Sequence, residues 1–274
     1  MTRILLLILA ATIPLSAYPA QEKSRSIVSD DFTNSRPRPK RHTRKRPREY
    51  RLASAALPKF PDELRQNTLK VGVTVWQVQH VTDGRGRLTR EVAKRVEAGT
   101  QFRDGDLIRL SVESPRTGYL YVVDCDWFKD SGQGEMNLIF PLRGEDNRLQ
   151  AGKLIDIPAA HQPPFKTAPK LDQVGELLTI IITKSPLSLS LSSEALPVSS
   201  HQLAEWADSW SGLTERFEMI DGAGQGRTRV ERQAASRDGV RQLTRDDPAP
   251  QTIYLLTPKS SEGLLFKLLL SYAR

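Results

Sequence analysis

Short runs in which apolar residues alternate with polar or small ones recur along most of the chain. In the first run, Val71, Val73 and Val75 occupy every second position. Successive side chains of a strand point to opposite sides of a sheet, so this pattern predicts a strand with one buried face. Similar runs occupy residues 107–113, 118–125, 136–140, 177–183, 252–256 and 264–272. Turn-forming clusters separate them, which indicates a mainly β fold, an antiparallel β-sandwich or a barrel-like domain.

One segment has the period of a helix instead. Leu203, Trp206, Ala207 and Trp210 lie on one side of a helix. Ser199 or Ser200 can cap it, so we expect one helix over residues 200–210, docked on the sheets. An aromatic ligand box on the same stripe is the alternative.

Two polar stretches flank that helix. Leucines and serines alternate over residues 187–192, but Pro186 and Pro197 bracket them, which favours a connector over an edge strand. Residues 221–245 are rich in Gly, Arg and Gln and have no apolar period, so we expect a long mobile loop.

The first 20 residues are typical of a secretory signal peptide. Arg3 precedes an apolar run from Ile4 to Ala17 that is too short to span a bilayer comfortably. We expect cleavage after Ala17 or Ala20 and a periplasmic or extracellular product, with an uncleaved anchor as the alternative. Cys125 is the single cysteine, so no intramolecular disulfide can form. A monomer is expected.

The positive charge is concentrated in a segment near the N-terminus. Between residues 36 and 51 lie nine cations and one anion, a surplus that equals the whole net charge of +8. The cations are Arg36, Arg38, Lys40, Arg41, Arg44, Lys45, Arg46, Arg48 and Arg51. Residues 21–57 have no apolar period and contain several prolines, so we expect a disordered basic arm.

Such an arm attracts polyanions by releasing their counterions. Outside the cytosol its targets would be anionic lipid head groups, an anionic envelope polymer or an envelope protein, and no intracellular nucleic acid. A solubilising spacer without a target is the alternative.

An ordered series of motifs resembles the bacterial domain of unknown function DUF4384. They are residues 102–110 (FRDGDLIRL), 113–122 (ESPRTGYLYV), 138–141 (LIFP), 146–149 (DNRL), 157–158 (IP) and 175–180 (GELLTI). The similarity covers residues 69–186 and leaves a C-terminal extension, residues 187–274, whose final strands span 252–272. Phrases at 202–206 and 246–254 are similar to the tail of this domain in exported proteins of soil bacteria such as Acidobacteria. The resemblance implies an envelope or secreted location and an accessory domain, and it supplies no catalytic residue.

Within the motifs, the turn glycines Gly105 and Gly118 are expected at positive φ. Tyr119 and Tyr121 should form an aromatic strand face opposite an aliphatic one.

Few residues suggest chemistry. Asp124, Asp126, Asp130 and Glu135 crowd one predicted hairpin and are weak calcium candidates, although their spacing is not that of a calcium loop. A solvated acidic turn is the main interpretation. The four histidines are scattered, and no hydrolase elbow or phosphate loop occurs.

The sequence therefore predicts an exported, non-catalytic interaction module of the cell envelope, without a cofactor. Two alternatives remain. One is a hydrolase-type enzyme with an unrecognised site, for which Asp124, Cys125 or Asp126 would be candidates. The other is a purely structural envelope component.

Overall fold

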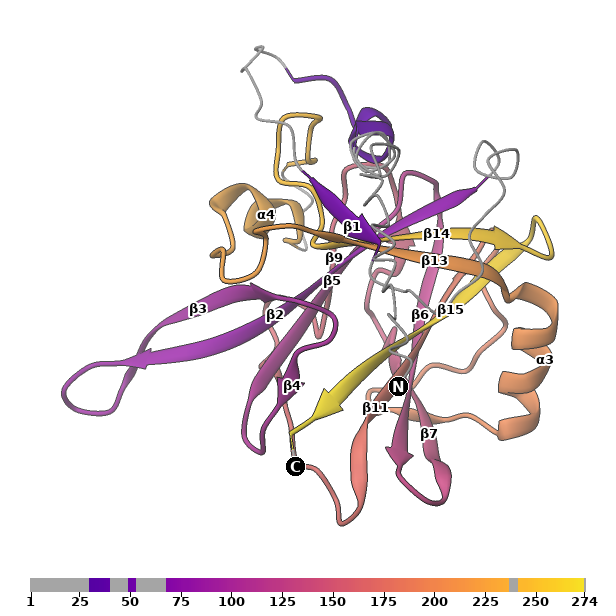
Figure 1. The fold of residues 1–274 in the computed structure, drawn as a ribbon, viewed down its shortest axis with the longest axis horizontal. Helices are drawn as coiled ribbons and strands as arrows, with labels where there is room; N and C mark the ends of the chain where they lie inside the picture. The colour runs from indigo at the N-terminus through magenta and orange to yellow at the C-terminus, as the bar shows by residue number, and fades with distance from the viewer. Residues whose placement is uncertain (1–29, 40–48, 53–67, 237–240, 274) are drawn as a thin grey trace, which may run out of the picture.

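The computed structural model describes residues 30–39, 49–52, 68–236 and 241–273. These residues form a mainly β structure in which two sheets pack face to face and one helix docks on the outside (Figure 1). The expected sandwich with a docked helix is confirmed. The predicted signal peptide lies outside the described residues.

The first sheet has the order β1-β13-β14-β2-β5-β10, with β3 beside β2 and β9 beside β5. Its strands are β1 (Tyr50–Leu52), β2 (Leu69–Thr82), β3 (Leu88–Val96), β5 (Leu107–Glu113), β9 (Ile155–Ile157), β10 (Phe165–Lys166), β13 (Gly212–Met219) and β14 (Thr252–Pro258). All their pairings are antiparallel.

The second sheet has the order β12-β7-β6-β11-β15-β4, with β8 beside β6. Its strands are β4 (Gln101–Phe102), β6 (Gly118–Phe128), β7 (Gly132–Phe140), β8 (Arg148–Leu149), β11 (Gln173–Thr183), β12 (Leu196–Pro197) and β15 (Gly263–Tyr272). Only β15 and β4 pair in parallel among the described strands.

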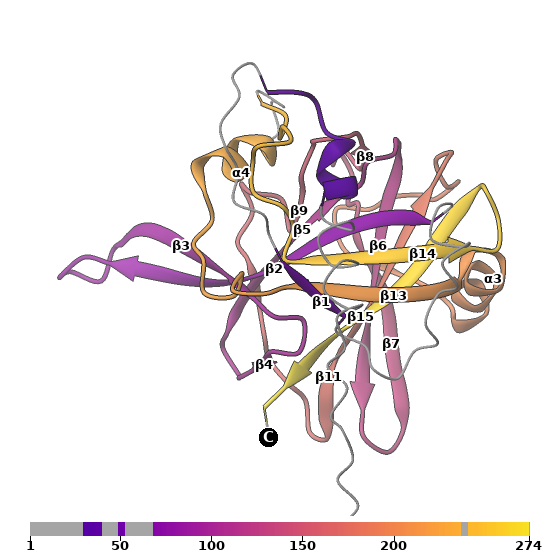
Figure 2. The same cartoon turned by 45° about the horizontal axis from the view of Figure 1, so that its top comes forward.

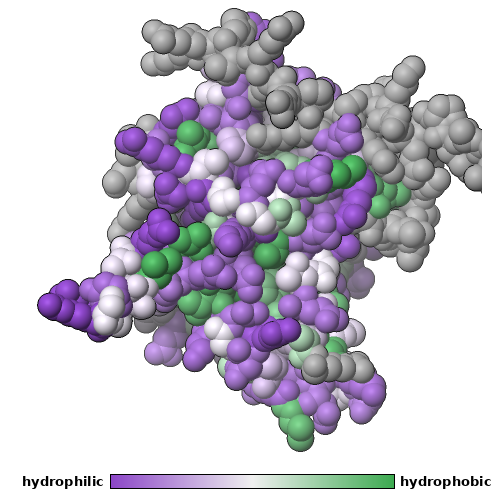
Figure 3. Space-filling view, turned by 60° about the vertical axis from the view of Figure 1, so that its left-hand side comes forward, coloured by the Kyte–Doolittle hydropathy of each residue, from purple (hydrophilic) through white to green (hydrophobic). Residues whose placement is uncertain are grey.

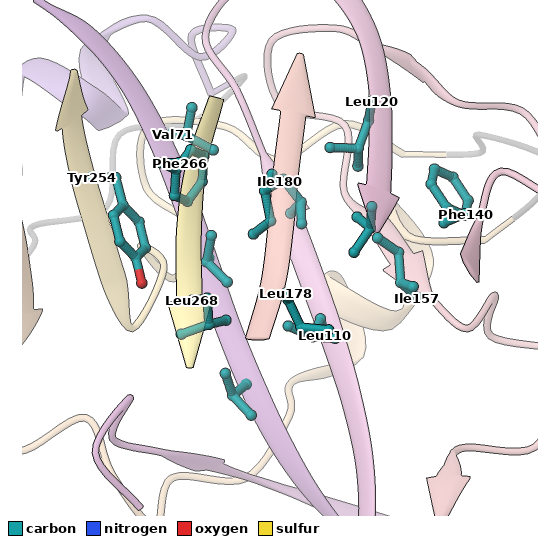
Figure 4. Packing of buried hydrophobic residues seen from close by; sticks show 14 of the residues in the cluster. Val71, Leu110, Leu120, Phe140, Ile157, Leu178, Ile180, Tyr254, Phe266 and Leu268 are labelled. Atoms are coloured by element: carbon teal, nitrogen blue, oxygen red, sulfur yellow. The ribbon is translucent and has the colours of Figure 1, made fainter. Parts of the chain in front are cut away.

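The main core fills the space between the sheets, where alternate residues of both sheets meet (Figure 4). Val71 and Leu110 come from the first sheet, and Leu120, Ile180 and Phe266 from the second; all are almost fully buried. The alternation seen in the sequence therefore specifies this core.

The outer face of the second sheet is covered by helix α3 (Ser200–Trp210), as expected. Ser199 caps it by accepting a hydrogen bond from the Gln202 amide. Leu203 packs with Tyr121 and Leu265 in a second apolar cluster. Tyr121 thus lies opposite the aliphatic face of β6, which confirms the expected division of that strand.

The outer face of the first sheet is covered by N-terminal and C-terminal segments. For residues 30–39 and 49–52 this corrects the expected disorder of residues 21–57; the rest of that range lies outside the described residues. Residues 30–34 form a short helical segment, and β1 pairs with β13. Phe32 and Tyr50 are fully buried with Ile253 and Phe217. Isolated anchors of this kind leave no period in a sequence, because each contacts a distant strand.

The expected mobile loop at residues 221–245 is also wrong for its described part. Residues 224–227 exchange backbone hydrogen bonds with β3, and helix α4 (Arg229–Ala234) follows. Thr228 and Glu231 form a capping box at its start, and the Glu231 carboxylate pairs with buried Arg95. These contacts order a stretch that has no apolar repeat.

The boundary expected at residue 186 does not separate two folding units. Strand β14 lies between β13 and β2, and β15 pairs with β11 along most of its length. The C-terminal extension therefore contributes central strands to both sheets, and its final strands at residues 252–272 are confirmed as β14 and β15.

Two turn glycines differ in their role. Gly105 has φ of 84°, as expected. Gly118 does not have positive φ; a Cβ there would lie 2.8 Å from the Thr183 carbonyl oxygen. A residue with a side chain would not fit at this position, because β6 and β11 approach closely there.

The hairpin of β2 and β3 projects from the body of the sandwich in two views (Figures 1 and 2). On the face shown in Figure 3, hydrophobic groups are scattered between hydrophilic ones. No helix in the described part of the chain has the length and apolar character needed to cross a membrane.

Candidate functional site

A cavity of about 120 Å³ lies between the two sheets. Most of its wall is apolar: Ile108, Leu110, Ile139, Phe165, Leu178 and Leu270. The polar groups on its wall are Asp124, Glu176, Lys166 and Thr167. An apolar hollow with a few polar groups is the usual form of a small-ligand site.

Asp124 lines this cavity because it lies two positions after Val122 and four after Leu120 on β6, and alternate residues of a strand share a face. Leu120 and Val122 both face the core. The Oδ1 of Asp124 is buried and has no hydrogen-bond partner among the described residues. Burial, followed by the nearby Glu176 and Asp126 carboxylates, raises the pKa of Asp124 to about 7. This carboxyl group therefore titrates near neutral pH.

Two neighbouring carboxylates have partners. Glu176, on β11, accepts a hydrogen bond from the Tyr272 hydroxyl, and burial raises the pKa of Glu176. Asp126 forms an ion pair with Lys170, with 2.5 Å between Oδ2 and Nζ, and accepts a hydrogen bond from Gln173. Asp124 differs from both because, among the described residues, its side chain forms neither an ion pair nor a hydrogen bond with a hydroxyl group.

The weak calcium candidates do not come together as a metal site. Asp130 and Glu135 are exposed near the tip of the β6–β7 hairpin, whereas Asp124 lines the cavity. In residues 30–39, 49–52, 68–236 and 241–273, no three acidic, histidine or cysteine side chains are arranged to hold a metal ion.

The surroundings of Cys125 do not favour a nucleophilic role. The residue is 1% exposed, and burial raises the pKa of its thiol. A higher pKa reduces the thiolate fraction on which cysteine reactivity depends.

A larger hollow, of about 250 Å³, lies beside β9. Two ion pairs lie at its wall: Lys153 is 2.7 Å from Asp146, and Asp156 is 2.8 Å from Arg227. Arg143 and Glu145 also line it, and each forms a hydrogen bond with a backbone group. The positive and negative side chains are therefore equal in number, and the hollow offers no net charge to a ligand.

The cations of the basic segment that the structure describes differ in how far they are buried. Arg36 is 2% exposed, and its Nε and Nη2 each lie 2.6 Å from a carboxylate oxygen of Glu113 on β5. The guanidinium also donates to the carbonyl oxygens of Thr244, Asp247 and Pro248. Arg36 was expected to bind polyanions, and this expectation is wrong because its donors are used inside the fold.

The other flank of the basic segment is also attached. Tyr50 donates a hydrogen bond to the Pro250 carbonyl, and the Glu49 carbonyl accepts one from the Ile220 amide. Arg51 forms a half-exposed ion pair with Glu97 at 2.8 Å. Arg38 is exposed. The other six cations, Lys40, Arg41, Arg44, Lys45, Arg46 and Arg48, lie outside the described residues.

Sequence reasoning missed Glu176 and Tyr272 as members of the site. A signal was present: Glu176 has the same parity as Leu178, Ile180 and Ile182 on the core-facing side of β11. A charged residue at a core-facing position of a strand indicates a cavity, an open sandwich end or a buried partner.

The chain was compared with known proteins at the levels of family, sequence and structure. No family model, curated protein or solved structure matches it. What this protein does is therefore inferred from its own residues and geometry.

Proposed function

We propose that the protein is an exported, non-catalytic interaction module of the cell envelope, which contacts polyanionic surfaces through its basic segment. The observation that carries the proposal is the attachment of both flanks of the six cations. Arg36 is attached to the fold on the N-terminal side of these cations and Tyr50 on the C-terminal side. The six cations themselves lie outside the described residues.

The remaining support comes from the sequence. The N-terminal 20 residues have the features of a signal peptide. An exported protein would meet anionic lipid and envelope polymer, and not intracellular nucleic acid. The resemblance to DUF4384 agrees with an accessory role in the envelope.

Binding to vesicles tests the polyanion proposal. The full chain should bind phosphatidylglycerol-containing vesicles, and the affinity should fall steeply between low and physiological salt. Replacing Arg44, Lys45 and Arg46 by alanine should cost about 3 kcal/mol or less, since each basic residue near an anionic surface contributes about 1 kcal/mol.

A matched control changes the net charge equally. Arg85, Arg90 and Lys94 are exposed on the β2–β3 hairpin, and replacing them by alanine should have the smaller effect. Equal losses in both triple variants would mean that binding follows net charge alone. Unchanged binding in the first variant would make the basic segment a spacer.

Export has a separate test. N-terminal sequencing of the secreted or periplasmic form should begin at Tyr18 or Gln21. Recovery of intact Met1 from the cytosol would contradict export.

One observation favours the enzyme alternative, namely the pKa of about 7 at Asp124, which suits a general acid. A panel of chromogenic esters and glycosides should show no turnover above that of the Asp124→Asn variant. Turnover that is lost in this variant would replace the binding proposal with a hydrolase.

A further inference from the structure

The cavity between the sheets has the size of a small hydrocarbon group. Its volume of about 120 Å³ is of the same order as that of engineered protein cavities that take up benzene, roughly 150 Å³. Leu110, Leu178 and Leu270 line it from three strands of the two sheets. The walls therefore suit an apolar group of about six carbon atoms.

The carboxyl group at this cavity lacks a counterion. Asp124 forms no ion pair within the described part of the chain. The Cys125 backbone donates a hydrogen bond to its carboxyl group, but the buried Oδ1 has no hydrogen-bond partner. Lys166 also lines the cavity, but its side chain is exposed and is not paired with Asp124. Asp124 is half-buried, and a charged carboxylate whose buried oxygen has no partner is costly; a cation beside it reduces that cost.

The chemistry of the cation follows from the walls. A metal ion needs several oxygen ligands, and the described side chains contain no such group. An organic ammonium ion needs one carboxylate, because its N–H groups can also donate to other acceptors such as Glu176 or Thr167, while its carbon stem contacts the leucines.

We propose that this cavity binds an organic primary ammonium ion with a short apolar stem, about the size of a benzyl or butyl group, and that Asp124 is its counterion. This site is separate from the basic segment, which carries charge of the opposite sign.

Calorimetric titration of the full chain with benzylammonium, with benzyl alcohol as the neutral isostere, tests this site. At pH 8 benzylammonium should bind at least about tenfold more tightly than the alcohol, since a charged partner strengthens the contact. Asp124→Asn should abolish this preference. Asp130→Asn, in the exposed hairpin, should keep it.

The pH dependence provides a second readout. Asp124 faces Glu176 from β11, Tyr272 from β15, Lys166 from β10 and Lys170 from the loop before β11, and Asp126 lies on its own strand. With its pKa at about 7, the ionised fraction falls about thirtyfold from pH 8 to pH 5.5, and the benzylammonium affinity should fall with it, by at most that factor. The alcohol should show no such change.

Three results would overturn the proposal: no binding of either probe, equal affinity for both, or an unchanged preference in Asp124→Asn. If Asp124→Asn shows no cooperative unfolding transition, and so is not properly folded, the pH profile of the unaltered chain tests the proposal instead. Vesicle binding should be the same in Asp124→Asn as in the unaltered chain, so the two proposals can fail independently.

Discussion

The two faces of the first sheet are both buried, but by different means. On the inner face, Val73 and Leu110 meet apolar residues of the second sheet. On the outer face of the same strands, Trp76, Ser111 and Glu113 meet charged side chains from distant parts of the chain. One face is held by a repeat of apolar residues and the other by individual pairs.

The described residues of the outer face form three buried ion pairs. They are Arg36 with Glu113, Arg95 with Glu231, and Arg227 with Asp156. Arg95 and Arg227 lie over the Trp76 ring at 5.3 and 5.4 Å from its centroid, and the Trp76 indole donates to Ser111. Each pair joins residues more than 70 positions apart. Breaking one pair should therefore cost more than a small loss of apolar volume on the inner face.

The largest expected effect comes from Arg95→Ala. It leaves the Glu231 carboxylate buried and unpaired, and it removes the hydrogen bond to the Ala249 carbonyl. The free energy of unfolding in urea should fall by about 3–5 kcal/mol. Lys94→Ala, its exposed neighbour, should change it by less than about 0.5 kcal/mol. Equal effects would show that the outer-face pairs are dispensable.

Asp124→Asn extends the comparison to a carboxyl group without a pair. Burial raises the pKa of Asp124 from 3.8 to about 7, so the folded state binds this proton more tightly than the unfolded state does. Stability is therefore lost as pH rises from about 4 to 7 and stays low above it. The variant should be more stable than the unaltered chain at pH 8, by at most about 4 kcal/mol, and the gain should vanish near pH 4.

Thermal unfolding of both proteins across pH 4 to 8 measures this difference. A gain that is the same at both ends of the range would mean that charge is not its cause.

Ile180→Val removes one methylene group from the inner face, where Ile180 is fully buried. The loss should be about 0.5–1.5 kcal/mol, because only a small volume is emptied. A loss as large as that of Arg95→Ala would reverse the expected order of the two faces.

Among the ion-pair variants, the smallest effect is expected for Arg51→Ala. The pair of Arg51 with Glu97 is about half exposed on both sides, so solvent screens it. The free energy of unfolding should change by less than about 1 kcal/mol, and less still at high salt.

The same comparison explains what could be predicted from the sequence. The strands of the inner face were visible because Val71, Val73 and Val75 repeat with the strand period, and helix α3 because Leu203 and Trp206 repeat with the helical one. The segments that cover the outer face could not be predicted in this way. Arg36 and Glu231 each make a single contact of this kind, and their partners lie far away in sequence. A run of arginines therefore indicated a disordered arm, although one member is a buried anchor.

The candidate site was predictable only in part. Asp124 was selected from a crowded acidic hairpin, but the cavity beside it depends on the register of β6 against β11. Tyr272 reaches Glu176 through the pairing of β15 with β11, which a single sequence does not reveal.

The central claim is that the fold uses one cation of the basic segment, Arg36, as a buried anchor and leaves the nearby Arg38 exposed. It is tested most directly by the free energies of unfolding of Arg36→Ala and Arg38→Ala, two changes of the same charge two residues apart. Arg36→Ala should cost about 3–5 kcal/mol, since Glu113 is left buried without its partner, and exposed Arg38→Ala should cost less than about 0.5 kcal/mol. Equal and negligible losses would contradict the claim and restore a detached arm.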